Sequence, residues 1–123
     1  MSTARRIAEA IGAPVGWGIV CGLLLAASAP LYIVGTLIGV LGGIAGGAQH
    51  ATLRGAIARA ATGGTLFGLA ILLGYELTGG EGAEVELPHP GILLVSFTLI
   101  PAFPLHWLGW RLSRSRRGPG TPA

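Results

Sequence analysis

This chain of 123 residues is 51% hydrophobic and only 11% charged, whereas about 25% of residues are charged in ordinary soluble domains. The length allows a single domain, and the composition argues against a water-soluble one. The net charge of +3 comes from arginines that flank apolar runs, so we expect no nucleic-acid partner.

Four apolar stretches are long enough to cross a bilayer as helices, which takes about 17 to 25 residues each. We predict them at 13–29, 31–48, 60–77 and 91–110. One helix over residues 13–48 would extend about 54 Å at 1.5 Å per residue, far beyond a hydrocarbon core of about 30 Å. The first two stretches are therefore expected to form two crossings with a turn at Pro30. The predicted fold is an all-α membrane domain over residues 1–111, a compact antiparallel bundle of four transmembrane helices.

The stretch before the first span allows two interpretations. Residues 2–11 suit a short interfacial helix that precedes an intact first span. Alternatively, Arg5 and Arg6 form the basic region of a signal peptide that is cleaved after residue 29, where Ala-Ser-Ala has a small-x-small pattern. Pro30 follows this pattern directly and is unfavourable at a cleavage site, so the intact span is the preferred prediction.

Charged residues are segregated along the chain. The arginines lie in three segments, 5–6, 54–59 and 111–117, whereas four of the five acidic residues lie between 76 and 86. Basic residues of membrane proteins concentrate on the cytoplasmic side. We therefore expect both termini and the 49–59 loop in the cytoplasm and the acidic 78–90 loop outside. The short loops favour a bacterial inner membrane.

The strongest motif is a glycine ladder in the second span, formed by Gly35, Gly39, Gly43 and Gly47. Residues four apart stack on one helix face, and small residues there let helix backbones approach closely in lipid. The first and third spans repeat the pattern with Gly18, Gly22, Gly64 and Gly68. We predict glycine-zipper packing, which can operate within one chain, in a homo-oligomer or in a larger membrane complex.

The fourth span contains Pro101 and Pro104. A proline inside a helix removes a hydrogen bond and clashes with the carbonyl four residues earlier, so we predict a kink here. A broken helix that lines a cavity, as in transporters, is the alternative. Residues 112–123 have no apolar period, and we expect them to form a disordered basic cytoplasmic tail.

Polar residues gather at the predicted cytoplasmic ends of the spans: Gln49, His50, Arg54, Arg59, His106 and Arg111. Trp107 and Trp110 lie beside them and are typical of a membrane interface. These residues form either a belt facing lipid headgroups or a basic pocket for an anionic lipid or partner.

No residue pattern typical of catalysis, metal binding or nucleotide binding occurs, and the chain has no Asp. We therefore expect no enzymatic activity, cofactor or metal. Two functions remain. In the first, the glycine faces mediate oligomerisation, or docking as an accessory subunit of a membrane complex. In the second, a small homo-oligomeric transporter or channel passes an ion or small solute along a broken fourth helix, with Gln49, His50 and His106 as its inner polar gate.

Two short stretches resemble known membrane-protein families. Residues 59–66, Arg-Ala-Ala-Thr-Gly-Gly-Thr-Leu, resemble part of the smallest subunit of multisubunit sodium/proton antiporters, whose Arg-Phe-Pro-Asp signature does not occur here. The glycine ladder followed by His50 is similar to the mitochondrial import-channel family, whose later motifs do not occur either. Neither resemblance assigns the chain to a family.

Overall fold

The computed structural model describes residues 2–78 and 91–117, and the predicted acidic loop lies almost entirely outside these ranges. The described residues form four long helices and one short 3-10 turn: α1 (Thr3–Ala27), α2 (Ala29–Ala48), α3 (Leu53–Leu77), η1 (Gly91–Leu93) and α4 (Leu94–Arg117). No strand occurs in the two described ranges. The prediction of an all-helical fold with four helices is confirmed.

Three of the four helices, α1, α2 and α3, are long and apolar enough to cross a membrane. The fourth predicted span is not among them. Two prolines, His106 and the arginines from Arg111 onwards make α4 less apolar than the others. The composition thus agrees with a membrane-embedded protein that crosses more than once, and a crossing by α4 remains a prediction.

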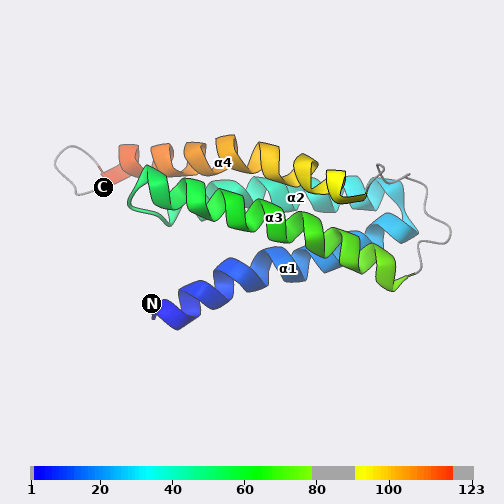
Figure 1. Cartoon of the computed structure of the whole chain (residues 1–123). Helices are drawn as coiled ribbons and strands as arrows, with labels where there is room; N and C mark the ends of the chain where they lie inside the picture. The colour runs from blue at the N-terminus through cyan, green and yellow to red at the C-terminus, as the bar shows by residue number, and fades with distance from the viewer. Residues whose placement is uncertain (1, 79–90, 118–123) are drawn as a thin grey trace.

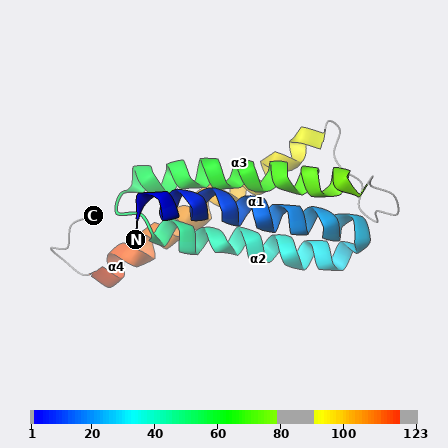
Figure 2. The ribbon, with the colours of Figure 1, turned by 90° about the horizontal axis from the view of Figure 1, so that it is seen from below.

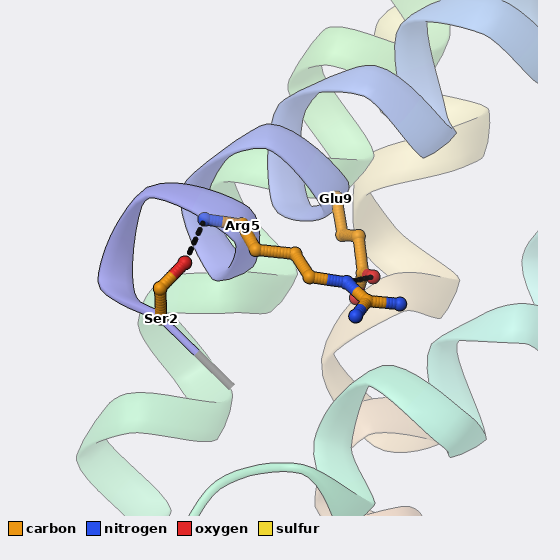
Figure 3. A network of polar contacts seen from close by, with 3 residues as sticks. All are labelled: Ser2, Arg5 and Glu9. Carbon is orange, nitrogen blue, oxygen red and sulfur yellow. Dashed lines mark hydrogen bonds and ion pairs between the residues drawn. The ribbon is translucent and has the colours of Figure 1, made fainter.

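The first helix begins ten residues earlier than the predicted span. The Ser2 hydroxyl accepts a hydrogen bond of 3.2 Å from the backbone N–H of Arg5, and the Arg5 side chain forms a 3.2 Å ion pair with Glu9 (Figure 3). A serine N-cap and an ion pair between residues four apart both stabilise a helix start. The predicted interfacial helix over 2–11 and the first span therefore form one continuous helix.

The turn between α1 and α2 is a single residue. Ser28 is extended, with φ −161° and ψ 120°, and its backbone N–H donates to the Leu24 carbonyl at 2.7 Å. Pro30 lies in the first turn of α2, where its missing N–H would have no partner in the helix anyway. The predicted turn thus occurs two residues before Pro30.

The fourth helix runs through Pro101 and Pro104 as one element and continues to Arg117. It is not broken into two helices, and a bend at the prolines remains a prediction. The disordered tail was predicted to begin at residue 112, but residues 112–117 are helical, and residues 118–123 lie outside the described ranges. Arg111 lies 5.3 Å from the Trp107 ring centroid and Arg114 lies 5.1 Å from that of Trp110. These cation–π contacts between residues four apart favour continued helix.

The helices form a bundle in which α3 contacts both α1 and α4, and α4 also packs along α2. The start of α1 and the end of α4 lie at the same end of the bundle, together with the α2–α3 loop (Figure 1). We call this the arginine end and the opposite one the Ser28 end. The fully buried Cys21, Leu25 and Ile71 form a core toward the Ser28 end. Toward the arginine end, α1 diverges from the other helices in Figure 1, and in Figure 2 it lies between α2 and α3.

Candidate functional site

The α2 glycine ladder faces other helices of the same chain. A Cβ atom added at Gly35 would lie 3.2 Å from Leu24 of α1, and one at Gly39 would lie 2.5 Å from the Phe67 ring of α3. At Gly43 it would meet the His106 ring at 2.9 Å. At Gly47 it would collide with the His106 backbone carbonyl. The ladder is therefore turned toward α1, α3 and α4.

The glycines of α1 and α3 also lie at helix contacts. A Cβ at Gly18 would lie 2.5 Å from the Ala70 methyl group, and one at Gly22 would collide with the Ile71 carbonyl oxygen. On the α4 side of α3, a Cβ at Gly64 would lie 2.9 Å from Leu99 Cα, and one at Gly68 would lie 2.6 Å from the Thr98 hydroxyl. The structure thus brings these helices together within one chain. Whether the glycines also associate different chains remains a hypothesis.

Two polar contacts join helices beside these glycines. The buried Thr98 hydroxyl of α4 donates to the Gly64 carbonyl of α3 at 2.8 Å. It also lies 2.9 Å from the Val95 carbonyl oxygen in its own helix. The Trp17 indole N–H of α1 donates to the Gly35 carbonyl of α2 at 2.8 Å. Hydrogen bonds between helices stabilise membrane bundles by up to about 2 kcal/mol each.

A cavity of about 290 Å³ lies between all four helices, in the half of the bundle nearer the arginine end. Its walls include Trp17 of α1, Gly43 of α2, Phe67 of α3 and His106 of α4. The lining is mostly apolar, with Arg59, His106 and Thr98 as its polar side chains.

The cavity opens at the molecular surface between α1 and α2. Its lining residues Ala13, Ile38 and Gly42 are exposed on the outside of the molecule. A Cβ at Gly42 or at Gly63, both of which line the cavity, would have no atom within 4 Å. Glycine therefore keeps space open here instead of admitting a neighbouring helix.

Arg59 lies at the polar end of the cavity, in the second turn of α3. Its guanidinium donates to the Gln49 side-chain oxygen at 3.3 Å. The ion pair between Arg5 and Glu9 is the only one among the described residues, so Arg59 pairs with no described carboxylate. Gly63 follows four residues later on the same helix face. An arginine and an open glycine thus line the same wall.

His106 lies opposite and is only 7% exposed. Its Nδ1 lies 2.8 Å from the Ala102 carbonyl oxygen. A carbonyl oxygen only accepts hydrogen bonds, so Nδ1 carries a proton, and Nε2 is an acceptor when the ring is neutral. Nε2 lies beside Gly46, where an added Cβ would be 2.9 Å away.

The six polar residues predicted to form one inner site separate into groups. Arg59 and His106 line the cavity, and Gln49 holds Arg59. Arg54 and Arg111 are exposed, which suits a belt facing headgroups. His50 lies beside the start of α3, with Nδ1 3.0 Å from where a Cβ of Gly55 would be. Its buried Nε2 has no hydrogen-bond partner, and burial followed by the charges of Arg59 and Arg6 lowers the pKa of His50.

Sequence reasoning did not identify several cavity residues, among them Trp17, Phe67 and Ala102. One signal was available on α4, because Thr98, Ala102 and His106 are four residues apart and share one helix face. No comparable spacing marks Trp17 and Phe67, which lie on different helices.

The described residues contain no group of three potential metal ligands. No protein-family model, curated protein or solved structure matches the chain significantly. The geometry of this chain is therefore the basis for assigning a function.

Proposed function

We propose that this protein is a four-crossing membrane protein that packs its own glycine faces around an internal cavity, and that it binds a small molecule there as a small transporter does. The observation that carries the proposal is the cavity of about 290 Å³ to which all four helices contribute. Ligand sites of bundles commonly lie between facing helices, and ligand pockets start at about 300 Å³.

The outward face of α4 supports the fourth crossing. Phe97, Ile100, Phe103 and Trp107 are 67%, 69%, 37% and 41% exposed and recur every three or four residues. Exposed α2 residues such as Leu37, at 57%, add further apolar surface. Soluble proteins rarely expose large apolar surfaces, whereas lipid would cover them.

Four crossings would place every described arginine on one side of the membrane. The alternating helix directions bring the ends of α1, α3 and α4 that carry arginines to the arginine end (Figure 1). We propose that this end faces the cytoplasm of a bacterial cell, since basic residues are retained there. Exposed residues such as Arg54 and Arg111 would then contact anionic headgroups, worth roughly 1 kcal/mol each.

The inward direction of the glycine ladder favours ligand binding over association through that ladder. Gly39, Gly43 and Gly47 already contact other helices of the same chain. A second chain could reach them only if α1 or α4 moved away. A ligand held beside α4 and the glycine face would therefore lie inside one bundle.

Docking as an accessory subunit or homo-oligomer is the second candidate function. It is favoured by an outer groove between α2 and α4, lined among others by Ile44, Ala48, Gly109 and Leu112. A cysteine at position 45, which also lines this groove, tests the hypothesis after Cys21→Ala removes the native thiol. Oxidative crosslinking to a dimer, or to a larger partner, in native membranes would support association through this groove.

Quenching of Trp17 fluorescence tests ligand binding directly. The chain has three tryptophans, so a protein with Trp107→Phe and Trp110→Phe retains only Trp17 in the cavity wall. In detergent micelles, ω-bromodecanol is expected to quench Trp17 saturably, because bromine quenches an indole that it contacts. Gly63→Leu fills the open space and should remove the saturable part.

The matched control is Gly12→Leu, since Gly12 also has no atom within 4 Å of an added Cβ and does not line the cavity. In the Gly12→Leu protein, ω-bromodecanol should quench Trp17 as it does in the parent protein. A linear, non-saturating response, or equal quenching in both leucine variants, would mean that the probe meets Trp17 only from the micelle and would refute the proposal.

A further inference from the structure

The cavity is polar at one end and apolar at the other. Arg59, near the start of α3, and His106 mark the polar end, while Trp17, Ile38 and Phe67 belong to the apolar part. Arg59 and Phe67 are eight residues apart on one helix, which corresponds to about 12 Å at 1.5 Å per residue. The site therefore has the length and polarity of an amphiphilic molecule.

The charge of Arg59 is not balanced within the described part of the protein. Of the two described acids, Glu9 pairs with Arg5, and Glu76 lies at the Ser28 end of α3. The contact with Gln49 is to a neutral amide. A partly buried cation beside an apolar space is unfavourable without an anion. An anionic headgroup would supply that partner.

The headgroup that fits is a carboxylate, because its two oxygens match the planar donors of a guanidinium. A carboxylic acid that is still protonated when it arrives from lipid can donate its O–H to His106 Nε2 on the opposite wall, and it pairs with Arg59 once it has lost that proton to water. The volume of about 290 Å³ is at the lower limit for ligand pockets and suits one chain rather than the two of a phospholipid. The opening at Ala13, Ile38 and Gly42 faces the surface that lipid would cover.

Building on the proposed function, we propose that the cavity binds a single-chain carboxylic acid of the fatty-acid type. Its carboxylate pairs with Arg59, and its chain lies between Trp17, Ile38 and Phe67. The open glycines Gly42 and Gly63 make room for the chain. The ligand enters sideways from the lipid phase, between α1 and α2.

The same Trp17 protein tests this assignment with two matched probes, ω-bromodecanoate and ω-bromodecanol, which differ only in the headgroup. The acid should bind at least about ten-fold more tightly than the alcohol, as expected for a charge-assisted hydrogen bond. Arg59→Gln should remove the preference for the acid, so that the ratio of the two affinities falls to about one. Arg59→Lys should retain part of the preference, because it keeps the charge.

Arg54→Gln is the matched control, since Arg54 belongs to the same helix but is exposed and does not line the cavity. It should keep the full preference for the acid. Thermal unfolding of each variant shows whether it is folded, and a folded Arg59→Lys still tests the inference if Arg59→Gln does not fold.

Each remaining outcome contradicts a different statement. Equal saturable binding of acid and alcohol, unaffected at Arg59, would refute the fatty-acid assignment and leave the ligand-binding function intact. No saturable quenching by either probe would refute the proposed function itself. In nanodiscs, a brominated two-chain phospholipid that quenches Trp17 saturably and independently of Arg59 would assign the cavity to bilayer lipid and refute the inference.

Discussion

At the Ser28 end, Gly22 of α1 and Gly74 of α3 face each other so closely that a methyl group on either would collide with the opposite backbone. Toward the arginine end, Gly42 of α2 and Gly63 of α3 face open space. Glycine thus closes the contact between α1 and α3 near the Ser28 end and leaves space open beside the cavity, while Gly47 still packs tightly against α4 toward the arginine end. What differs is whether a neighbouring backbone fills the space that the missing side chain leaves.

This difference has a physical basis in how membrane helices associate. Lipid tails are as apolar as the helix side chains, so helices associate through close van der Waals contact and interhelical hydrogen bonds. Contact between backbones provides this where α1 meets α3. Where α1 diverges, that contact is lost, and the Trp17–Gly35 hydrogen bond and Thr98–Gly64 hydrogen bond border the cavity instead.

The sharpest way to break the close contact between α1 and α3 is Gly22→Ala. The new methyl group would meet the Ile71 carbonyl oxygen and the Tyr75 and Gly74 backbones, none of which can move without the whole helix. We expect a loss of about 3 kcal/mol in the free energy of unfolding, at the upper end for overpacking. Gly16→Ala is the control in the same helix, because its Cβ would have no atom within 4 Å. Unfolding by SDS in mixed micelles measures the stability of both variants. An equal loss of stability in Gly22→Ala and Gly16→Ala would disprove the close contact.

Two neighbouring glycines compare a closely packed face and an open face of α3 directly. A Cβ at Gly64 would lie 2.9 Å from Leu99 Cα, whereas one at Gly63 would have no atom within 4 Å. Gly64→Ala should therefore cost about 1 to 2 kcal/mol. Gly63→Ala should be neutral or stabilising by up to about 1 kcal/mol, since alanine favours the helix. The same SDS titration measures the free energy of unfolding of both variants. A larger loss of stability in Gly63→Ala than in Gly64→Ala would show that the packed and open faces of α3 are wrongly assigned.

The hydrogen bond from Thr98 offers a smaller perturbation. Thr98→Val keeps the shape and removes the O–H that donates to the Gly64 carbonyl. The expected cost is about 1 kcal/mol, typical of one hydrogen bond between membrane helices. Thr62→Val, at an exposed position of α3, should change the SDS midpoint by much less. Equal SDS midpoints for Thr98→Val and Thr62→Val would show that the hydrogen bond from Thr98 does not stabilise the contact between α4 and α3.

The smallest effect concerns pH. Burial and the charges of Arg59 and Arg6 lower the pKa of His50 below its ordinary value of 6.5, so protonation of His50 opposes folding. Its contribution to stability is complete above pH 6.5 and decreases as the pH falls below that value. From about pH 8 to about pH 5, the wild type should lose more stability than His50→Gln. Identical pH profiles would show that His50 titrates as it would in the unfolded chain.

The sequence was sufficient to predict the number of helices and the separation of α1 from α2. Apolar runs bounded by Pro30 and by arginines contain that information locally. The early start of α1 was also encoded, in Ser2 and in the Arg5–Glu9 spacing, but these local signals were not combined with the apolar run. The helical residues 112–117 are accompanied by cation–π contacts of Arg111 and Arg114 with tryptophans, which a lack of apolar period does not predict.

The cavity could not be predicted in the same way. The spacing of Gly35 to Gly47 shows that one face is small, but not whether a helix, a second chain or empty space lies opposite. That depends on how far α1 diverges from α2, a property of the whole bundle. Likewise, Arg59 and Arg54 look equivalent in the sequence, and only the rotation of α3 places one beside the cavity and the other outside.

The most direct test of the account asks on which side of the membrane three positions lie. In a Cys21→Ala background, single cysteines replace Arg54, Thr78 and Ser115, and a membrane-impermeant maleimide labels them in right-side-out and inverted vesicles. The account predicts that positions 54 and 115 are labelled from the cytoplasmic side and position 78 from the opposite side. If 115 is labelled together with 78, α4 does not cross, and if 54 is labelled together with 78, the embedded bundle itself is wrong.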